Sequence, residues 1–137
     1  MAGTLASFRP GTSHEACAFF DAIEVATGER VPHVHFVAGE QFPLGSEPKG
    51  LIPNRRFRPD GYVAERREVW FYHGDWFHGW PPGHPKHETF VIGNHWGPDR
   101  YVATMAVMQL FKEHGFVVKY AWGSDFKLHG IQSIRTL

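Results

Sequence analysis

The chain has 137 residues, of which 42% are hydrophobic and 20% charged, so it is long enough to bury a core and too apolar to be disordered. Its 14 Lys and Arg residues balance its 14 Asp and Glu residues, which argues against nucleic-acid binding through overall positive charge. There is no membrane-length apolar run and no signal-peptide pattern, and the single cysteine excludes a disulfide framework. We expect one soluble domain over 1–137, located inside the cell, in either cytoplasm or nucleus.

The first half of the chain predicts a tail, a helix, a strand and a long loop. Residues 1–11 have the composition of a loose tail. Residues 12–28 combine a capping box, apolar residues at helical spacing and a closing glycine, which predicts a helix. Residues 30–39 predict a strand. Residues 41–59 are rich in Pro and Gly and predict a loop long enough to be functional.

The second half predicts a sheet with a covering helix. Residues 62–66 and 68–73 predict two short strands that pair, and residues 74–98 predict a second long loop. Residues 100–114 predict a helix that is apolar nearly all round and therefore buried. Residues 116–122 predict an apolar, β-branched strand. The order of these elements is typical of an α/β or α+β sheet with helices packed on it.

A carboxylate and an imidazole are placed to meet at one end of the two paired strands. Asp60 lies in a Pro-Asp-Gly turn before the first strand, and His73 ends the second. Alternation puts Phe71 and His73 on one face of the sheet and Tyr72 on the other. Phosphodiester cleavage needs a hard oxygen ligand for Mg²⁺ and a proton acceptor, and these residues offer both. A simple turn and a hydrogen-bonded core histidine are equally consistent with the spacing.

Arginines are concentrated in one segment despite the neutral net charge. Residues 53–67 contain Arg55, Arg56, Arg58, Arg66 and Arg67 with only two acidic residues. Such a segment can bind phosphate even when the whole chain is not basic. A solvated, arginine-rich loop explains the same composition.

The segments RFRPDGYVAERREVWFYHGDWFHGWPP and YVATMAVMQLFKEHGFVVKYAW carry a family resemblance. Over residues 57–126 the chain resembles the very-short-patch repair mismatch endonucleases and their viral and mobile-element relatives, within the restriction-endonuclease-like nuclease superfamily. The resemblance implies an α/β fold with a mixed β-sheet core flanked by helices. It also implies an endodeoxyribonuclease that depends on Mg²⁺, or on Mn²⁺ as an alternative, and that acts in DNA repair or as a homing-type endonuclease.

The resemblance assigns roles to five residues of this chain. Asp60 matches the family's metal-binding aspartate, and Tyr72 matches the residue whose main-chain carbonyl also binds the metal. His73 matches the histidine proposed as general base. His78 matches a second active-site histidine that acts at the scissile phosphate. Glu15 matches the helix glutamate that supports the site.

Further positions are implied for DNA contact and for support of the metal. Trp76 and Phe77 fall where the repair enzymes place aromatic residues that wedge into DNA, an arrangement that unstacks a base step and bends the duplex. The candidates for phosphate contact are Arg55, Arg56 and Arg58. Thr104 stands where the repair enzymes have a supporting aspartate and where many mobile-element relatives have threonine.

Some positions depart from the family pattern. Gly123 follows the last strand where the family usually has glutamate, and Asp75 replaces a cysteine of the repair enzymes' structural zinc site. We therefore expect no structural zinc. The expected partner is DNA, bound by a monomer or a homodimer, and no membrane contact is expected. A catalytically inactive DNA-binding module on the same fold is the first alternative.

A second alternative comes from the remaining histidines. His33, His35 and Glu40 resemble the first metal motif of the cupins, in which imidazoles hold Fe²⁺ or Zn²⁺ for small-molecule chemistry. A long buried helix before the final strand argues against a cupin barrel. The late histidines His84, His87 and His95 could bind zinc, but loop histidines without cysteine are more often exposed to solvent.

Overall fold

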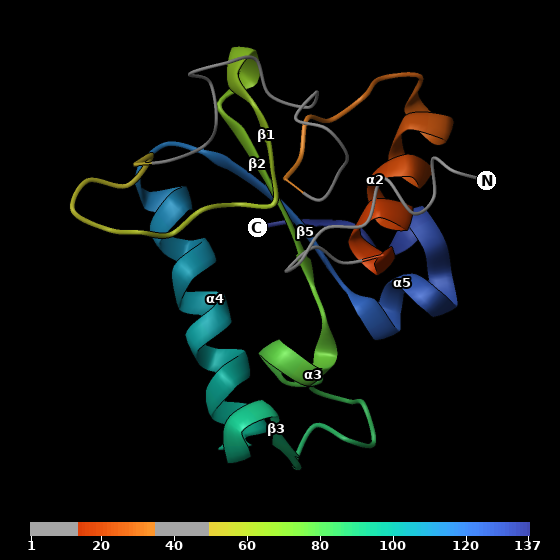
Figure 1. The fold of residues 1–137 in the computed structure, drawn as a ribbon, viewed down its shortest axis with the longest axis vertical. Coiled ribbons are helices and arrows are strands. Elements are labelled where there is room, and N and C mark those ends of the chain that lie inside the picture. Colours follow the sequence, from red (N-terminus) through yellow and green to blue (C-terminus); the bar gives the residue numbers. More distant parts are fainter. Residues whose placement is uncertain (1–13, 35–49) are drawn as a thin grey trace.

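A four-stranded mixed sheet with the strand order β1–β2–β5–β6 forms the centre of the molecule (Figure 1). Its strands are β1 (Gly61–Val63), β2 (Glu68–His73), β5 (Val117–Trp122) and β6 (Arg135–Thr136). The two central strands are parallel, and each edge strand is antiparallel to its neighbour. The structure is a computed structural model that describes residues 14–34 and 50–137. The predicted mixed α/β architecture is confirmed, whereas the predicted tail, 1–11, lies outside the described residues.

The predicted pairing of the two short strands is confirmed. β1 and β2 form an antiparallel pair in which Gly61 lies opposite Trp70, and the short 3-10 helix η1 (Ala64–Arg66) connects them. All six residues of β2 are buried, because helices cover both faces of the sheet. Alternation sends Phe71 toward one helical layer and Tyr72 toward the other, as the sequence predicted.

Helix α2 (His14–Thr27) covers one face of the sheet and agrees with the helix predicted over 12–28. Its buried residues recur at helical spacing: Ala16, Phe19, Phe20 and Ile23. They pack against Trp70 and Tyr72 of β2, and Phe126 of helix α5 (Gly123–His129) joins the same cluster. Gly28 follows the helix with φ 73°, and its N–H donates to the carbonyl of Glu24 at 2.8 Å, so the predicted glycine stop is confirmed.

Helix α4 (Gly97–Glu113) covers the opposite face, so the sheet lies between α4 and the pair α2 and α5 (Figure 1). Met108 and Phe111 pack on Phe71 and are fully buried. The prediction that this helix is buried all round was wrong, because Val102 on its outer face is 65% exposed. Only one face of α4 meets the sheet, and no described element covers the other.

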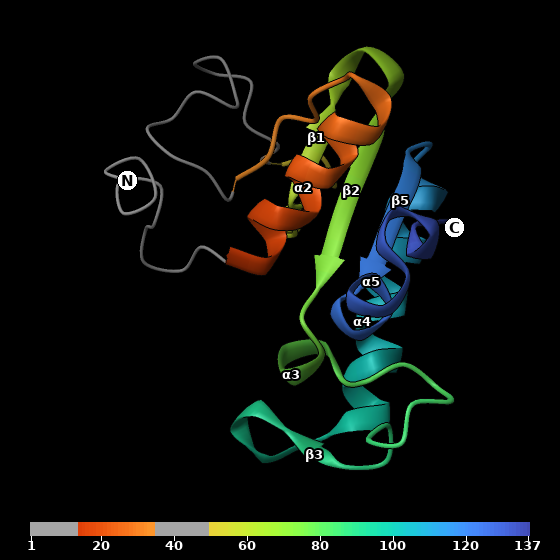
Figure 2. The ribbon, with the colours of Figure 1, turned by 90° about the vertical axis from the view of Figure 1, so that its right-hand side faces the viewer.

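The predicted loop 74–98 contains short elements that sequence periodicity does not reveal. They are α3 (Asp75–His78), β3 (Phe90–Val91), η2 (Ile92–Asn94) and β4 (His95–Trp96). Figure 2 shows α3 and β3 beyond the carboxyl end of β2. Helix α5, the 3-10 helix η3 (Gly130–Ser133) and β6 were also not predicted. Elements of two to seven residues carry too few periods to be recognised, and their tertiary contacts hold them.

The strand predicted over 30–39 is present only as a single bridge within the described residues. His33 pairs with Gly61 in an isolated antiparallel bridge, and the N–H of Val34 donates to the carbonyl of Asp60 at 2.9 Å. Residues 35–39 lie outside the described part. These contacts fix the backbone on both sides of Asp60. Among residues 14–34 and 50–137, no helix is both long enough and apolar enough to cross a membrane.

The start of α4 depends on a glycine. A Cβ atom at Gly97 would lie 2.6 Å from the carbonyl oxygen of Thr89 and 2.7 Å from that of His87, and backbone atoms yield little. We expect Gly97→Ala to lower the free energy of unfolding by about 1–3 kcal/mol in denaturant titration. Gly74→Ala is the matched control, because Gly74 has φ −68° and its Cβ would make only an ordinary contact at 3.5 Å. Equal stability of both variants would contradict this close packing.

Candidate active site

Asp60 is held against the main chain of β2. Its N–H donates to the carbonyl of Trp70 at 2.9 Å, and its Oδ2 accepts the N–H of Tyr72 at 2.9 Å. β1 starts only at Gly61, so the Asp60 side chain occupies the position of a strand partner opposite Tyr72. The N–H and C=O of one strand residue point to the same edge, so the Tyr72 carbonyl also faces the Asp60 side. The Asp60 carboxylate and the Tyr72 carbonyl therefore lie on the same side of β2, and their predicted role as metal ligands stays a prediction.

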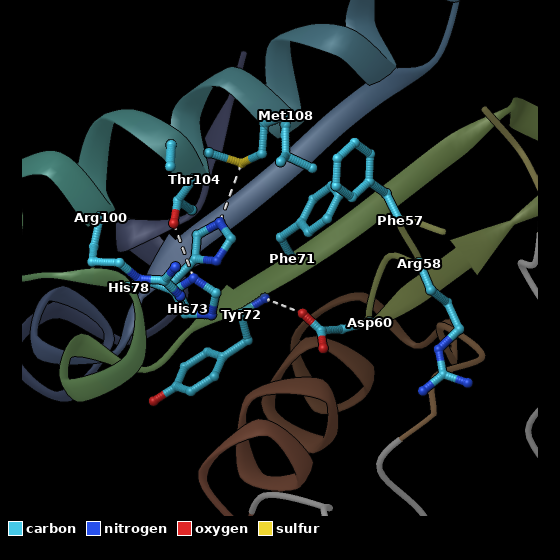
Figure 3. Close-up of a pocket in the computed structure, with 12 residues that line it drawn as sticks. Phe57, Arg58, Asp60, Phe71, Tyr72, His73, His78, Arg100, Thr104 and Met108 are labelled. Carbon is cyan, nitrogen blue, oxygen red and sulfur yellow. Dashed lines mark hydrogen bonds between the residues drawn. The ribbon is translucent and has the colours of Figure 1, made fainter. Parts of the chain in front are cut away.

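A pocket of about 300 Å³ opens beside this carboxylate, between the end of β2 and helix α4 (Figure 3). The predicted site residues that line it are Asp60, Tyr72, His73, His78, Thr104 and Arg58. Phe57, Phe71, Val107 and Met108 give it an apolar wall. The fold thus brings together residues that are separated by up to 46 positions in the sequence, from Arg58 to Thr104.

His73 lies deeper than the sequence predicted. Its side chain is only 3% exposed, its ring is 4.5 Å from the ring of Trp122, and its Nε2 lies 3.3 Å from the sulfur of Met108. Its Nδ1 is buried and has no hydrogen-bond partner among the described residues. Burial, together with the nearby His78, holds the pKa of His73 well below its usual value. His73 is therefore a neutral core residue at the back of the pocket, whereas the sequence predicts that it emerges beside Asp60.

His78 is the more accessible imidazole of the pocket. Its Nδ1 lies 3.0 Å from Oγ1 of Thr104, and its ring is 4.7 Å from that of His73. Burial lowers the pKa of His78, the Asp60 carboxylate opposes that shift, and the Arg100 guanidinium adds to it. If Nδ1 carries the hydrogen and donates it to Thr104, Nε2 is left as a proton acceptor. Thr104, predicted to support the metal, instead contacts this ring in the structure, and its predicted role toward a metal stays a prediction.

Arg100 also belongs to the pocket, although the sequence analysis did not select it. Its Nε and Nη2 donate to the carbonyl of Phe77 at 3.2 and 3.0 Å, which ties α3 to α4. Arg100, Thr104 and Met108 recur every four residues, so they lie along one face of α4. That spacing from Thr104 was the signal that could have identified Arg100 in the sequence.

Glu15 lies on the opposite face of the sheet from the pocket. Its Oε1 accepts the phenol of Tyr72 at 2.8 Å, and its Oε2 pairs with Lys127 at 3.2 Å. Because the Tyr72 side chain points away from α4, Glu15 supports the strand and not the pocket itself. Gly123 leaves room for this contact, since a Cβ there would lie 2.9 Å from the Tyr72 hydroxyl and 3.1 Å from Asp75. Glu15 thus lies outside the pocket lining and holds Tyr72 from the other face, and its predicted support of the active site stays a prediction.

The predicted DNA-contacting residues are exposed. Trp76 and Phe77 on α3 are each 51% exposed. The three candidate arginines, Arg55, Arg56 and Arg58, are exposed on the segment that leads into β1.

The other arginines of the basic segment serve the fold. Arg66 pairs with Glu29 at 2.7 Å and with Glu68 at 3.1 Å. Arg67 lies 4.3 Å from the Phe116 ring centroid, so only part of the segment remains available for phosphate.

The histidines of the alternative metal sites have other surroundings. His33 is 4% exposed, and its ring stacks on Phe20 with centroids 4.4 Å apart. His84 Nδ1 accepts the N–H of Lys86, and His87 Nδ1 lies 2.6 Å from the Trp80 carbonyl. His35 and Glu40 lie outside the described residues, as does any site that they complete. Within 14–34 and 50–137, no three His, Cys, Asp or Glu side chains are grouped to hold a metal ion.

No protein-family model matches this chain, and no curated protein or solved structure shows significant similarity to it. The resemblance to the repair endonucleases therefore stays a prediction that rests on the residues themselves.

The buried histidine generates a prediction for stability. Below about pH 6.5 the unfolded chain protonates His73, whereas the folded chain does not until its lowered pKa is reached. The free energy of unfolding should therefore be highest above pH 6.5 and fall as the pH drops, by up to about 1.4 kcal/mol per pH unit from this residue. Denaturant titrations between pH 5 and 8 measure the slope. His73→Leu should flatten it, and the exposed control His129→Gln should not; an unchanged slope in His73→Leu would contradict the assignment.

Proposed function

We propose that the chain is a metal-dependent DNA endonuclease of the restriction-endonuclease-like kind. The single observation that carries the proposal is the pocket in which the Asp60 carboxylate is fixed on the Tyr72 amide and faces His78 and Arg100. This arrangement offers a hard anionic ligand, a proton acceptor and a cation within one cavity. Metal-dependent hydrolysis of a phosphodiester can use groups of all three kinds.

The oxygen ligands fit Mg²⁺, with Mn²⁺ as the alternative. Mg²⁺ is often held by only one or two carboxylates together with substrate phosphates, so Asp60 and the Tyr72 carbonyl form a sufficient protein share. The hydrogen bond from the Tyr72 N–H fixes the Asp60 carboxylate in one orientation. When bound, the metal would polarise the scissile phosphate and offset its charge.

His78, in preference to His73, is the proposed general base. It is neutral at physiological pH because burial lowers its pKa, and its Nε2 makes no hydrogen bond within the described residues. A water oxygen attacks phosphorus while Nε2 takes its proton, and the bond from phosphorus to the leaving oxygen breaks in line. The leaving oxygen takes its proton from solvent. His73 supports the His78 ring from behind and moves no proton.

Arg100 and the exposed side chains are proposed to hold the DNA. The remaining N–H groups of Arg100 can donate to the attacked phosphate, because its side chain lines the pocket. Arg58 lines the same pocket and would contact a neighbouring phosphate. Trp76 and Phe77 project from α3 next to Arg100, and they would stack on or wedge between bases.

One observation favours a second candidate, an inactive DNA-binding module. Asp60 is the single carboxylate among the described residues that line the pocket, which is the lower number of the one or two carboxylates that Mg²⁺ sites use. Such a module would bind DNA through the same arginines and aromatics without cutting it. The cupin alternative is disfavoured, because the described sheet is open and flanked by helices.

The proposal predicts that Asp60→Asn removes cleavage without unfolding the chain. The substitution keeps the shape of the side chain but lowers its charge and its affinity for a divalent metal. Conversion of supercoiled plasmid to nicked or linear DNA, with Mg²⁺ and with chelator, measures the activity. The control is Asp21→Asn, an exposed acid on α2. Cleavage by Asp60→Asn at the wild-type rate would exclude the mechanism, and DNA binding without cleavage by the wild-type chain would select the inactive module.

The two histidines should separate in a cleavage assay. His78→Ala should lower kcat by about 10²–10⁴, the usual contribution of a general base. His73→Phe should retain most activity, because an aromatic ring still fills the space beside Trp122. The acid limb of the wild-type pH profile should lie below the ordinary histidine pKa of about 6.5, and Arg100→Gln should shift it upward by removing a charge that lowers the pKa of His78. Loss of activity in His73→Phe with an active His78→Ala would reverse the two roles.

A further inference from the structure

A second pocket, of about 240 Å³, lies next to the first at the carboxyl end of β5. α4, β5, α5 and the C-terminal segment meet there with two prolines, Pro81 and Pro82, of the loop after α3. Trp122 connects the two pockets, because its ring lies 4.5 Å from His73 in the first and 5.0 Å from Tyr101 in the second. The volume is below the roughly 300–1,000 Å³ of sites for drug-sized ligands, so it suits a smaller group.

Four polar side chains converge on this second pocket, each from a different element. They are Tyr101 of α4, Tyr120 of β5, Asp125 of α5 and Arg135 of β6. None of the four makes a side-chain hydrogen bond within the described residues. Burial, the neighbouring Tyr120 and the charge of Asp125 raise the pKa of Tyr101 while Arg135 opposes the rise, so its phenol remains a donor at neutral pH. Convergent polar groups without protein partners are typical of a binding site.

The charges restrict the chemistry of the ligand. The Asp125 carboxylate disfavours a simple anion such as phosphate, and the Arg135 guanidinium disfavours a simple cation. The rings of Tyr101, Tyr120 and Trp122 form one aromatic cluster, and together with the prolines they provide flat apolar surface. These features select a planar, uncharged heterocycle with donors on one edge and acceptors on another.

Guanine has this distribution of groups. Its adjacent N1–H and N2 amino groups match the two oxygens of a carboxylate, and its O6 and N7 acceptors match a guanidinium. Adenine has no such pair of adjacent donors for Asp125. It also carries an amino donor at the position of guanine O6, so this donor would face the Arg135 guanidinium. We propose that the second pocket binds a guanine base, with Asp125 on its donor edge, Arg135 on its acceptor edge and the aromatic cluster against its face.

The base could come from a free guanine nucleoside or nucleotide, or from an unstacked position in a DNA strand. The proposal goes beyond cleavage and does not need the first pocket to be active. In a DNA complex, however, the two pockets would hold neighbouring parts of a strand, because Trp122 of the second pocket packs against His73 of the first.

Titration of the full chain with guanosine, inosine and adenosine tests the proposal, with amide and indole NMR shifts as the readout. Guanosine should bind. Inosine lacks the N2 amino group and should bind about five- to hundredfold more weakly, and adenosine should not perturb the indole signal of Trp122. Asp125→Asn and Arg135→Gln should each weaken guanosine binding by a similar factor, and the control Asp21→Asn should not. Absence of guanosine binding, equal binding of adenosine or an unaffected Asp125→Asn would overturn the proposal.

Competition by oligonucleotides distinguishes the two sources of the base. A single-stranded oligonucleotide with one guanine that displaces guanosine assigns the pocket to a DNA base, and one with adenine in its place serves as the control. Lack of displacement, with guanosine still bound, assigns it to a free nucleoside. The Asp60→Asn variant should bind guanosine as the wild type does, because Asp60 lines only the first pocket. Failed cleavage with intact guanosine binding therefore refutes only the nuclease, and the reverse refutes only the guanine site.

Discussion

The parallel pairing of β2 with β5 is the constraint on which both pockets depend. Its register sets His73 opposite Trp122, so the two strands end at the same level. Side chains that follow the two parallel strands therefore gather at the carboxyl end of the sheet. Beyond this end, the strands no longer form hydrogen bonds with each other. The Asp60 carboxylate occupies one such position on the Tyr72 amide, and the second pocket opens on the other side of β5, beside the start of β6.

The two histidines of one short segment have opposite environments because the chain changes direction between them. His73 is the last residue of a strand with six buried positions, and alternation points it into the α4 layer. Gly74 then leads into α3, where His78 is only partly buried and can reach Thr104. Desolvation makes the first imidazole a poor proton acceptor for substrate, whereas the second keeps access to the pocket. A shared residue type and close spacing thus gave no guide to their separate roles.

The arginine-rich segment was divided in a similar way by tertiary contacts. Composition alone marked five arginines as equivalent, but Arg66 and Arg67 are engaged by acidic and aromatic partners from distant segments. The arginine whose charge acts on His78 is Arg100, which lies on α4, outside the arginine-rich segment. Charge density along a sequence therefore indicates that cations are available, whereas only the packing of the helix on the sheet decides which of them face the pocket.

The long elements and the alternation within β2 could be predicted from local sequence patterns. The apolar residues of α2 recur at helical spacing, and alternate residues of β2 face opposite sides of the sheet. These local patterns predicted both elements correctly. The structure also places Asp60 at the start of the strand pair, as the sequence predicts. Three features depend on tertiary contacts: the depth of His73, the position of Glu15 outside the pocket lining and the assembly of the second pocket from distant segments. These properties arise from desolvation and from contacts between elements, and neither is encoded in the local periodicity of the chain.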